Sequence, residues 1–261
     1  MPAEPTPPAD DNPLTSFRYG NVVAPDKAFF DSFQRRFAVM ERELPPASDS
    51  RQAALTSVLG VTHTEFQNRR GVSEDDRARF AEILHRAYTG RGMEDPAAFL
   101  ESLPAADLEV VRRTHGLVEP IQPRSLSREG AYNLLLPDGY MVDFNHDGLS
   151  DVGAAKAGVF PPVDAPAEVR DAWLKATEHM SETEMMVYGM NLSLGLSSTA
   201  QPSAQEPAPA NTTASYRSLI DTMLQRNEEF RAFLAPGQYE RDRAFYGQLQ
   251  ELLRIADRAS A

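Results

Sequence analysis

The residues best suited to chemistry in this 261-residue sequence lie together in DFNHDGLSDVG, at residues 143–153. Oxygen-bearing side chains occupy alternate positions of this stretch, and a glycine, Gly148, follows the third of them. Ca²⁺ takes about six to eight oxygen ligands, which a short segment supplies when alternate side chains converge and the backbone curls around the ion. Glycine tolerates the backbone angles of such a turn. The spacing predicts a calcium-binding loop with five ligand residues: Asp143, Asn145, Asp147, Leu149 through its backbone carbonyl, and Asp151.

This stretch resembles the loop D-x-[DN]-x-[DN]-G-x-x-D that EF-hands, dockerins and integrin-like FG-GAP repeats carry on different scaffolds. The resemblance covers residues 143–154 only, so it implies a bound Ca²⁺ and no function for the whole chain. A polar Ser150 at the eighth position and Val152 at the tenth are more similar to the FG-GAP version than to an EF-hand. An EF-hand also closes its loop with a bidentate glutamate at the twelfth position, where this chain has Ala154.

Five loop oxygens leave the coordination shell incomplete. Water would complete it, or a carboxylate from nearby in the sequence: Asp138, Asp164 or Glu129. Without bidentate closure we expect weak binding, with a dissociation constant of roughly 10⁻⁵ to 10⁻³ M. His146 is expected to be exposed and no ligand, because imidazole is a poor ligand for calcium. The alternative is a plain polar turn, since Asp, Asn and Gly all favour turns.

Composition excludes several classes of function. A formal net charge of −12 argues against binding to nucleic acid, whose backbone is negatively charged, and against adsorption to anionic membranes. The chain has no cysteine, which removes disulfides, thiolate metal sites and a cysteine nucleophile. The arginine, alanine and proline usage is typical of a GC-rich bacterial genome.

No apolar run approaches the length of about 18 residues that a membrane-spanning helix needs. The first residues, MPAEPTPPADDNP, lack the basic start and apolar stretch of a secretory signal. We therefore expect a cytoplasmic protein by default, with export by a route that reads no cleaved signal as the open alternative.

Apolar residues recur at helical spacing through most of the chain, which predicts a mainly α fold of about eight to ten helices. Ser73 precedes an acidic first turn and an apolar stripe, as at a helix N-terminus. The expected helices cover residues 25–44, 48–60, 73–90, 95–103, 104–116, 125–136, 164–180 and 181–198, with two more inside 214–258.

The second half of the segment 181–198 is ambiguous. Ser181 and Glu184 form a capping box, which favours a helix. The run from Tyr188 to Leu196 alternates large apolar with small or polar residues, which is the period of a strand. Residues 186–198 are therefore left open between helix and strand. The methionines of this region are taken as ordinary core, with a surface that binds partners adaptively as the alternative.

Composition also divides the chain. Residues 1–24 are rich in proline and acid and are expected to be a disordered tail. A helical body with the calcium loop spans 25–198, and a linker of small residues and proline follows at 199–213. The helical hairpin at 214–258 then carries two apolar stripes. We expect it to be separable, and to bind a protein partner or a second copy of the chain.

No motif for nucleotides, zinc or a serine nucleophile occurs, and the five histidines are scattered. The leading prediction is a non-catalytic calcium-binding protein of interaction or assembly, in which the ion orders the connection between helical segments. One alternative is an enzyme with a site assembled from distant residues. Another is a secreted bacterial protein whose folding is completed by calcium.

Overall fold

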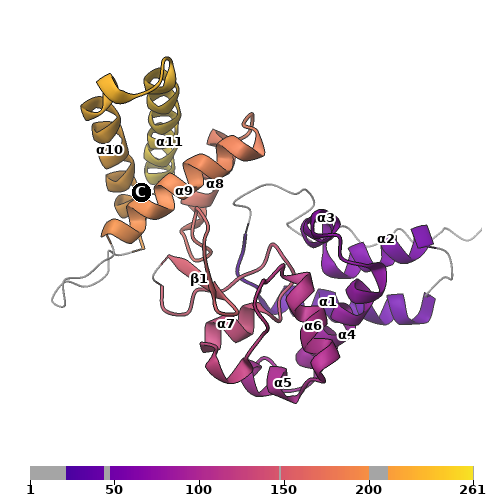
Figure 1. The fold of residues 1–261 in the computed structure, drawn as a ribbon. Coiled ribbons are helices and arrows are strands. Elements are labelled where there is room, and N and C mark those ends of the chain that lie inside the picture. Colours follow the sequence, from indigo (N-terminus) through magenta and orange to yellow (C-terminus); the bar gives the residue numbers. More distant parts are fainter. Residues whose placement is uncertain (1–21, 44–47, 147, 200–210, 261) are drawn as a thin grey trace, which may run out of the picture. The chain divides into compact units, whose positions relative to one another are not determined.

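The structure is a computed structural model that describes residues 22–43, 48–146, 148–199 and 211–260. Within these ranges it contains eleven α-helices, two short 3-10 helices and one two-stranded sheet. The predicted mainly α fold is confirmed (Figure 1). No helix among the described residues is long and apolar enough to span a membrane.

The chain forms two compact units. Unit 1 contains the residues up to Val142 and a short return at Asp151–Lys156. Unit 2 contains Asp143–Ser150 and the chain from Ala157 onward. The predicted calcium loop therefore begins where the chain first leaves unit 1.

Unit 1 is built from helices whose apolar stripes meet in one core. Phe80, Leu84, Leu100 and Val111 are fully buried there, and Phe33 of the first stripe joins them. This burial explains why the stripes read from the sequence form helices. The helices are α1 (Lys27–Glu43), α2 (Ser48–Leu59), α3 (Val61–Arg70), α4 (Glu74–Thr89), α5 (Pro96–Ser102), α6 (Ala105–Thr114), η1 (Pro123–Ser125) and α7 (Arg128–Asn133).

Helix α3 was not predicted. Gly60 has φ of 94°, a left-handed value that interrupts the helical backbone before α3 begins. The buried side chains of α3 are Thr62, His63 and Gln67, all polar. A helix with a polar buried face carries no apolar periodicity, so the sequence offered no signal for it.

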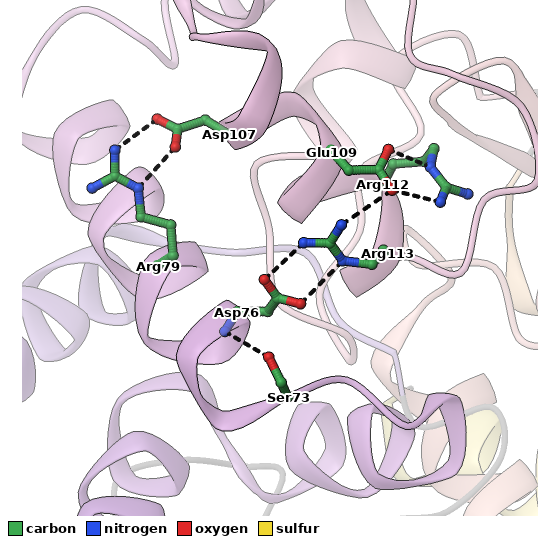
Figure 2. A network of polar contacts seen from close by, with 7 residues as sticks. All are labelled: Ser73, Asp76, Arg79, Asp107, Glu109, Arg112 and Arg113. Atoms are coloured by element: carbon green, nitrogen blue, oxygen red, sulfur yellow. Dashed lines mark hydrogen bonds and ion pairs between the residues drawn. The ribbon is translucent and has the colours of Figure 1, made fainter.

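Charged side chains fasten α4 to α6, as Figure 2 shows. Ser73 accepts a hydrogen bond from the backbone N–H of Asp76 over 3.1 Å, which confirms it as the N-cap of α4. Arg79 donates to both oxygens of Asp107 of α6, over 2.8 and 3.0 Å. Arg113 of α6 donates to Asp76 over 2.8 Å. The carboxylate of Asp107 is nearly buried, so this pair is a fixed part of the helix packing.

Two short strands, β1 (Leu149–Val152) and β2 (Ala155–Gly158), form the sheet. They were not predicted, because this stretch lacks a clear alternation of apolar and polar residues. Their turn is held against α7, since the N–H of Gly153 donates to the carbonyl of Gly130 over 3.0 Å. A Cβ atom on Gly130 would lie 2.2 Å from the carbonyl oxygen of Gly153, so only glycine fits.

Unit 2 contains α8 (Ala167–Ala176), α9 (Glu182–Thr199), α10 (Thr213–Glu229), η2 (Arg231–Phe233) and α11 (Gln238–Ser260). Its core is aromatic. Trp173 of α8 is fully buried, with ring centroids 5.1 Å from Phe160 and 6.0 Å from Phe245 of α11. Tyr216 of α10 also contacts Phe160. The predicted hairpin thus exists as α10 and α11, side by side in Figure 1, and packs on α8.

The division into units differs from the predicted domain boundary at 199–213. Helices α8 and α9 belong with the hairpin in unit 2, because the hairpin's stripes cover Trp173. Residues 200–210 of the predicted linker lie outside the described residues, whereas Asn211 and Thr212 are held to Asp164 and to the start of α10.

The open segment 186–198 is helical throughout, as part of α9. Ser181 and Glu184 bond each other reciprocally, through 2.9 and 3.3 Å hydrogen bonds to each other's backbone N–H. The predicted tail lies outside the described residues up to position 21. Its last residues are paired, since Val23 forms a parallel bridge with Tyr140.

Candidate metal site in residues 143–151

The loop closes on its first carboxylate. Asp143 is 5% exposed, and its Oδ2 accepts a hydrogen bond from the N–H of Gly148 over 2.9 Å. Both residues belong to unit 2. This bond spans five residues, so it bends the backbone between them into a tight curl around the carboxylate of Asp143.

Two left-handed residues produce the curl. Gly148 has φ of 77°, as expected for a glycine at the sharp turn. His146 has φ of 56° and is the one described non-glycine residue with a positive φ. A left-handed backbone costs a residue with a side chain about 1–2 kcal/mol, so the local interactions of the loop must hold His146 in place.

The other loop ligands predicted in unit 2 differ in how far their side chains are exposed, and one of them is not described. Asn145 has an exposed side chain, and Leu149 begins β1 with a half-buried one. Asp147 lies outside the described residues, so its predicted role stays a prediction. Among the described residues, no three His, Asp or Glu side chains converge as a metal cluster.

Asp151, the fifth predicted ligand, belongs to unit 1. Its Oδ2 accepts a hydrogen bond from the hydroxyl of Ser127 over 2.7 Å, and its Oδ1 an ion pair from Lys156 over 3.0 Å. Burial raises the pKa of this carboxyl, but the bonds from Ser127 and Lys156 outweigh it, and the net pKa is lowered. Both oxygens of Asp151 thus already have partners in unit 1.

Two of the three carboxylates considered for completing the shell are committed in unit 1. Arg70 binds Asp138 through two nitrogens, over 2.9 and 3.1 Å. Burial raises the pKa of Asp138, but hydrogen bonding and charge from His63 and Arg70 lower it to about 2. Glu129 is also buried, and accepts the backbone N–H of Asp151 over 2.7 Å.

The third carboxylate, Asp164, belongs to unit 2 and reaches the loop. Its Oδ2 lies 2.7 Å from Nδ1 of His146, whose side chain is 67% exposed. The pKa of Tyr216 is raised, first by burial and then by the negative charges of Asp164 and Asp143. Asp143 and Asp164 therefore both raise the pKa of the same hydroxyl. The prediction that His146 is exposed is confirmed, and its contact with Asp164 was not foreseen.

A second polar site, in unit 1, was missed from the sequence. His63 is fully buried, and its Nδ1 lies 2.7 Å from Oδ2 of Asp138, while its Nε2 lies 2.6 Å from the amide of Gln67. Phe80 stacks on the ring at a centroid distance of 5.3 Å. A polar pocket of about 230 Å³ lies beside it and is lined in part by His63 and Gln67. The two partners of His63 stand four and 75 residues away, and the distant one leaves no local pattern in a sequence.

No known family model, curated protein or solved structure matches this chain. The chain's own residues are therefore the basis for a function.

Proposed function

We propose that this chain is a non-catalytic calcium-binding protein of interaction or assembly, with the ion held by the loop at residues 143–149. The observation that supports it most is the hydrogen bond from Gly148 to the buried carboxylate of Asp143. This bond turns the chain back toward a carboxylate, and carboxylate oxygens are ligands that a hard cation takes.

The ligand set follows from the chemistry and from unit 2. Asp143, Asn145 and Asp147 supply side-chain oxygens, and Leu149 supplies its carbonyl. Asp164 supplies the further carboxylate, because it already lies against His146 of the same loop. Water completes the shell. Three carboxylates without a bidentate glutamate favour calcium at a dissociation constant of roughly 10⁻⁵ to 10⁻³ M.

The ion's role would be structural. Within residues 143–149 the described residues His146 and Gly148 have left-handed backbone angles, and an ion bound by this loop would help to hold the backbone in that conformation. This stretch lies where the chain leaves unit 1. By ordering this stretch, the ion would order the connection between helical segments.

Thermal unfolding tests the proposal. Protein is melted in chelator, in 10 mM Ca²⁺ and in 10 mM Mg²⁺, at equal ionic strength. For the stated affinity range, 10 mM calcium stabilises the native state by about 1.4–4 kcal/mol. For a chain of this size each kcal/mol raises the melting temperature by about 2–4 °C. Magnesium should do much less, because it demands tighter octahedral geometry.

Asp143→Asn is the matched control, because an asparagine oxygen can still accept the bond from Gly148 while the charge is lost. The variant should melt at one temperature in chelator and in calcium. A wild-type melting temperature that does not respond to calcium would contradict the structural role of the ion.

The enzyme alternative has one feature in its favour, the pair of His63 and Asp138 beside a polar pocket. Asp138 orients the imidazole as it would in a catalytic dyad. The other ring nitrogen, however, faces Gln67 at 2.6 Å. Both nitrogens are therefore engaged, which favours a structural tie between α3 and the turn before Tyr140.

The hairpin remains the proposed surface for a protein partner. Most of its stripes are buried in unit 2, and Phe230 and Phe233 at its tip are left 55% and 84% exposed. Their rings lie 6.4 Å apart, so together they present one aromatic knob. The partner's side of such a contact is then an apolar pocket.

A further inference from the structure

Helix α9 is apolar on both of its faces. One face is buried in unit 2: Met185 and Leu192 are 3% and 0% exposed, and Tyr188 packs on Phe245 at a centroid distance of 4.1 Å. Tyr188 also donates a hydrogen bond to Asp242 of α11 over 2.9 Å. These contacts fix which side of α9 looks outward.

The opposite face is a row of large apolar side chains that the unit does not cover. Met186, Val187, Met190 and Leu194 are each between 42% and 61% exposed. With about 3.6 residues per turn they form a single stripe about 100° wide. A helix that is apolar all round is normally buried all round, so this stripe marks a contact surface. The expectation that the methionines of this segment are ordinary core holds for Met185 and is wrong for Met186 and Met190.

The distribution of charge on the chain indicates which partner would bind the exposed face of α9. The chain has a net charge of −12, so most of its surface repels a second copy. The described part of α9 from Met185 to its end carries no charged residue, and the two acidic residues of the helix stand in its first turn. A charge-free face on an acidic chain is suited to contact with its own copy.

The spacing within the stripe fits a helix pair. Val187, Met190 and Leu194 follow one another at intervals of three and four residues, the spacing of a coiled-coil seam. In a two-fold pair each residue contact occurs twice, with the roles of the copies exchanged. In an antiparallel pair centred on Met190, that residue meets its own copy and Val187 meets Leu194.

The antiparallel direction also separates the acidic residues. Glu184 stands six residues before Met190, about 9 Å along the axis. The two copies of Glu184 are then about 18 Å apart along the axis, beyond the Debye length of about 8 Å at physiological salt. A parallel pair would place them side by side.

We infer that the chain forms a two-fold dimer through the outer face of α9, with antiparallel helices and Met190 at the symmetry axis. This surface is separate from the loop at 143–149 and from the tip of the hairpin.

Sedimentation equilibrium of the full chain between about 1 and 200 µM tests the inference. Wild type should move from the monomer mass of 28.9 kDa to twice that mass. Met190→Glu and Met190→Lys each place two like charges at the axis, and each should weaken the dimer at least tenfold. An equimolar mixture of the two variants should restore it, because only the mixed pair brings opposite charges together.

Val39→Glu is the matched control, since it puts the same charge on an exposed apolar side chain of α1, outside every proposed surface, and should leave the dimer intact. Val187→Glu repeats the test off the axis, and circular dichroism melts verify that all variants fold. The inference is overturned by a wild type that stays monomeric at 200 µM, by a dimer that survives either Met190 variant, or by a mixture that fails to associate. A dimer that Phe233→Glu dissociates and Met190→Glu does not would place the interface on the hairpin.

Discussion

At the scale of single residues, the loop depends on backbone angles as much as on ligands. Asp143 can present its carboxylate to an ion only while the chain between it and Gly148 stays curled, and the bond between these residues is what the structure shows of that curl. The φ of 77° at Gly148 is the condition for that bond. The glycine is thus as much a part of the proposed site as the carboxylates.

Gly148→Ala tests this dependence. A Cβ atom there would have no neighbour nearer than 4.0 Å, so the substitution adds backbone strain without a clash. The left-handed conformation should cost alanine about 1 kcal/mol, which lowers calcium affinity about fivefold to tenfold. Calorimetric titration measures it. Gly158→Ala in β2 is the control, because its φ is not positive and its nearest contact is an ordinary 3.5 Å; equal affinities in the two variants would argue against the curled loop as the binding form.

At the scale of elements, packing between short segments sets the local stability. Helix α7 and the turn between β1 and β2 touch through glycine, and the side chain of Asn133 donates to the carbonyls of Val142 and Asp151 over 3.0 and 2.8 Å. These bonds tie the end of unit 1 before the loop to its return after the loop.

Gly130→Ala should break this contact. The added Cβ would lie 2.2 Å from a backbone oxygen, so the turn must move and lose its hydrogen bond. We expect a loss of about 2–3 kcal/mol in the free energy of unfolding, measured by urea denaturation. Gly247→Ala, inside α11 with no atom within 4 Å of the new Cβ, should instead stabilise by about 0.5–1 kcal/mol. A loss of stability in Gly130→Ala no larger than about 0.5 kcal/mol would show that the turn is not packed on α7.

The ion pair between Arg79 of α4 and Asp107 of α6, drawn in Figure 2, predicts that the stability of the protein depends on pH. Burial raises the pKa of Asp107, but hydrogen bonds from Arg79 and Arg86 outweigh it, so the folded pKa lies below the ordinary value of 3.8. The unfolded chain therefore takes up the proton first as the pH falls. The stabilisation is fully present above about pH 5 and is lost progressively as the pH falls through 4 towards the lowered pKa.

Asp107→Asn should accordingly cost about 2 kcal/mol at pH 7, the scale of a hydrogen bond to a charged group. The difference in the free energy of unfolding between this variant and wild type should become smaller below pH 4. Urea denaturation at pH 7, 5 and 3.5 checks both statements. Glu101→Gln, which removes an exposed pair with Arg124, should change stability little at any pH. If the stability difference between Asp107→Asn and wild type does not depend on pH, the negative charge of Asp107 does not contribute to the contact between α4 and α6.

Local signals in the sequence predicted the elements that local chemistry determines. The caps at Ser73 and Ser181 were visible because the capping partner stands three residues away. Helix α3 could not be predicted because its buried face is polar, and the partner of His63 in that face, Asp138, lies far along the chain. The choice between helix and strand for 186–198 could not be made, because α9 is apolar on both faces and either period fits.

At the scale of the whole molecule, the division of the chain depends on which apolar stripes cover each other. A flexible linker composition predicted a hairpin that could be removed. The structure instead places Phe245 of that hairpin on Trp173, and no local pattern shows which stripe an aromatic residue will meet. The same holds for the candidate calcium ligands. Their spacing could be recognised in the sequence, whereas the contact of Asp164 with the loop and the partners of Asp151 arise only in the folded chain.

Truncation tests the revised division. Removal of residues 200–261 uncovers Trp173, which is fully buried in the intact chain. The truncated protein should lose its near-ultraviolet circular dichroism from this tryptophan and bind a hydrophobic dye, as loosely packed states do. A truncated protein with a sharp melt and an intact near-ultraviolet spectrum would restore the separable hairpin.

Calorimetric titration of the chelator-treated full chain with calcium shows whether residues 143–149 hold an ion. Wild type should bind one ion with a dissociation constant of roughly 10⁻⁵ to 10⁻³ M. Asp143→Asn should show no binding in this range. Asp164→Asn should bind more weakly than wild type, and Asp151→Asn should lose less affinity than Asp143→Asn, because Ser127 and Lys156 already hold that carboxylate. The loop is not a calcium site if Asp143→Asn binds calcium as tightly as wild type, or if wild type binds none at 10 mM.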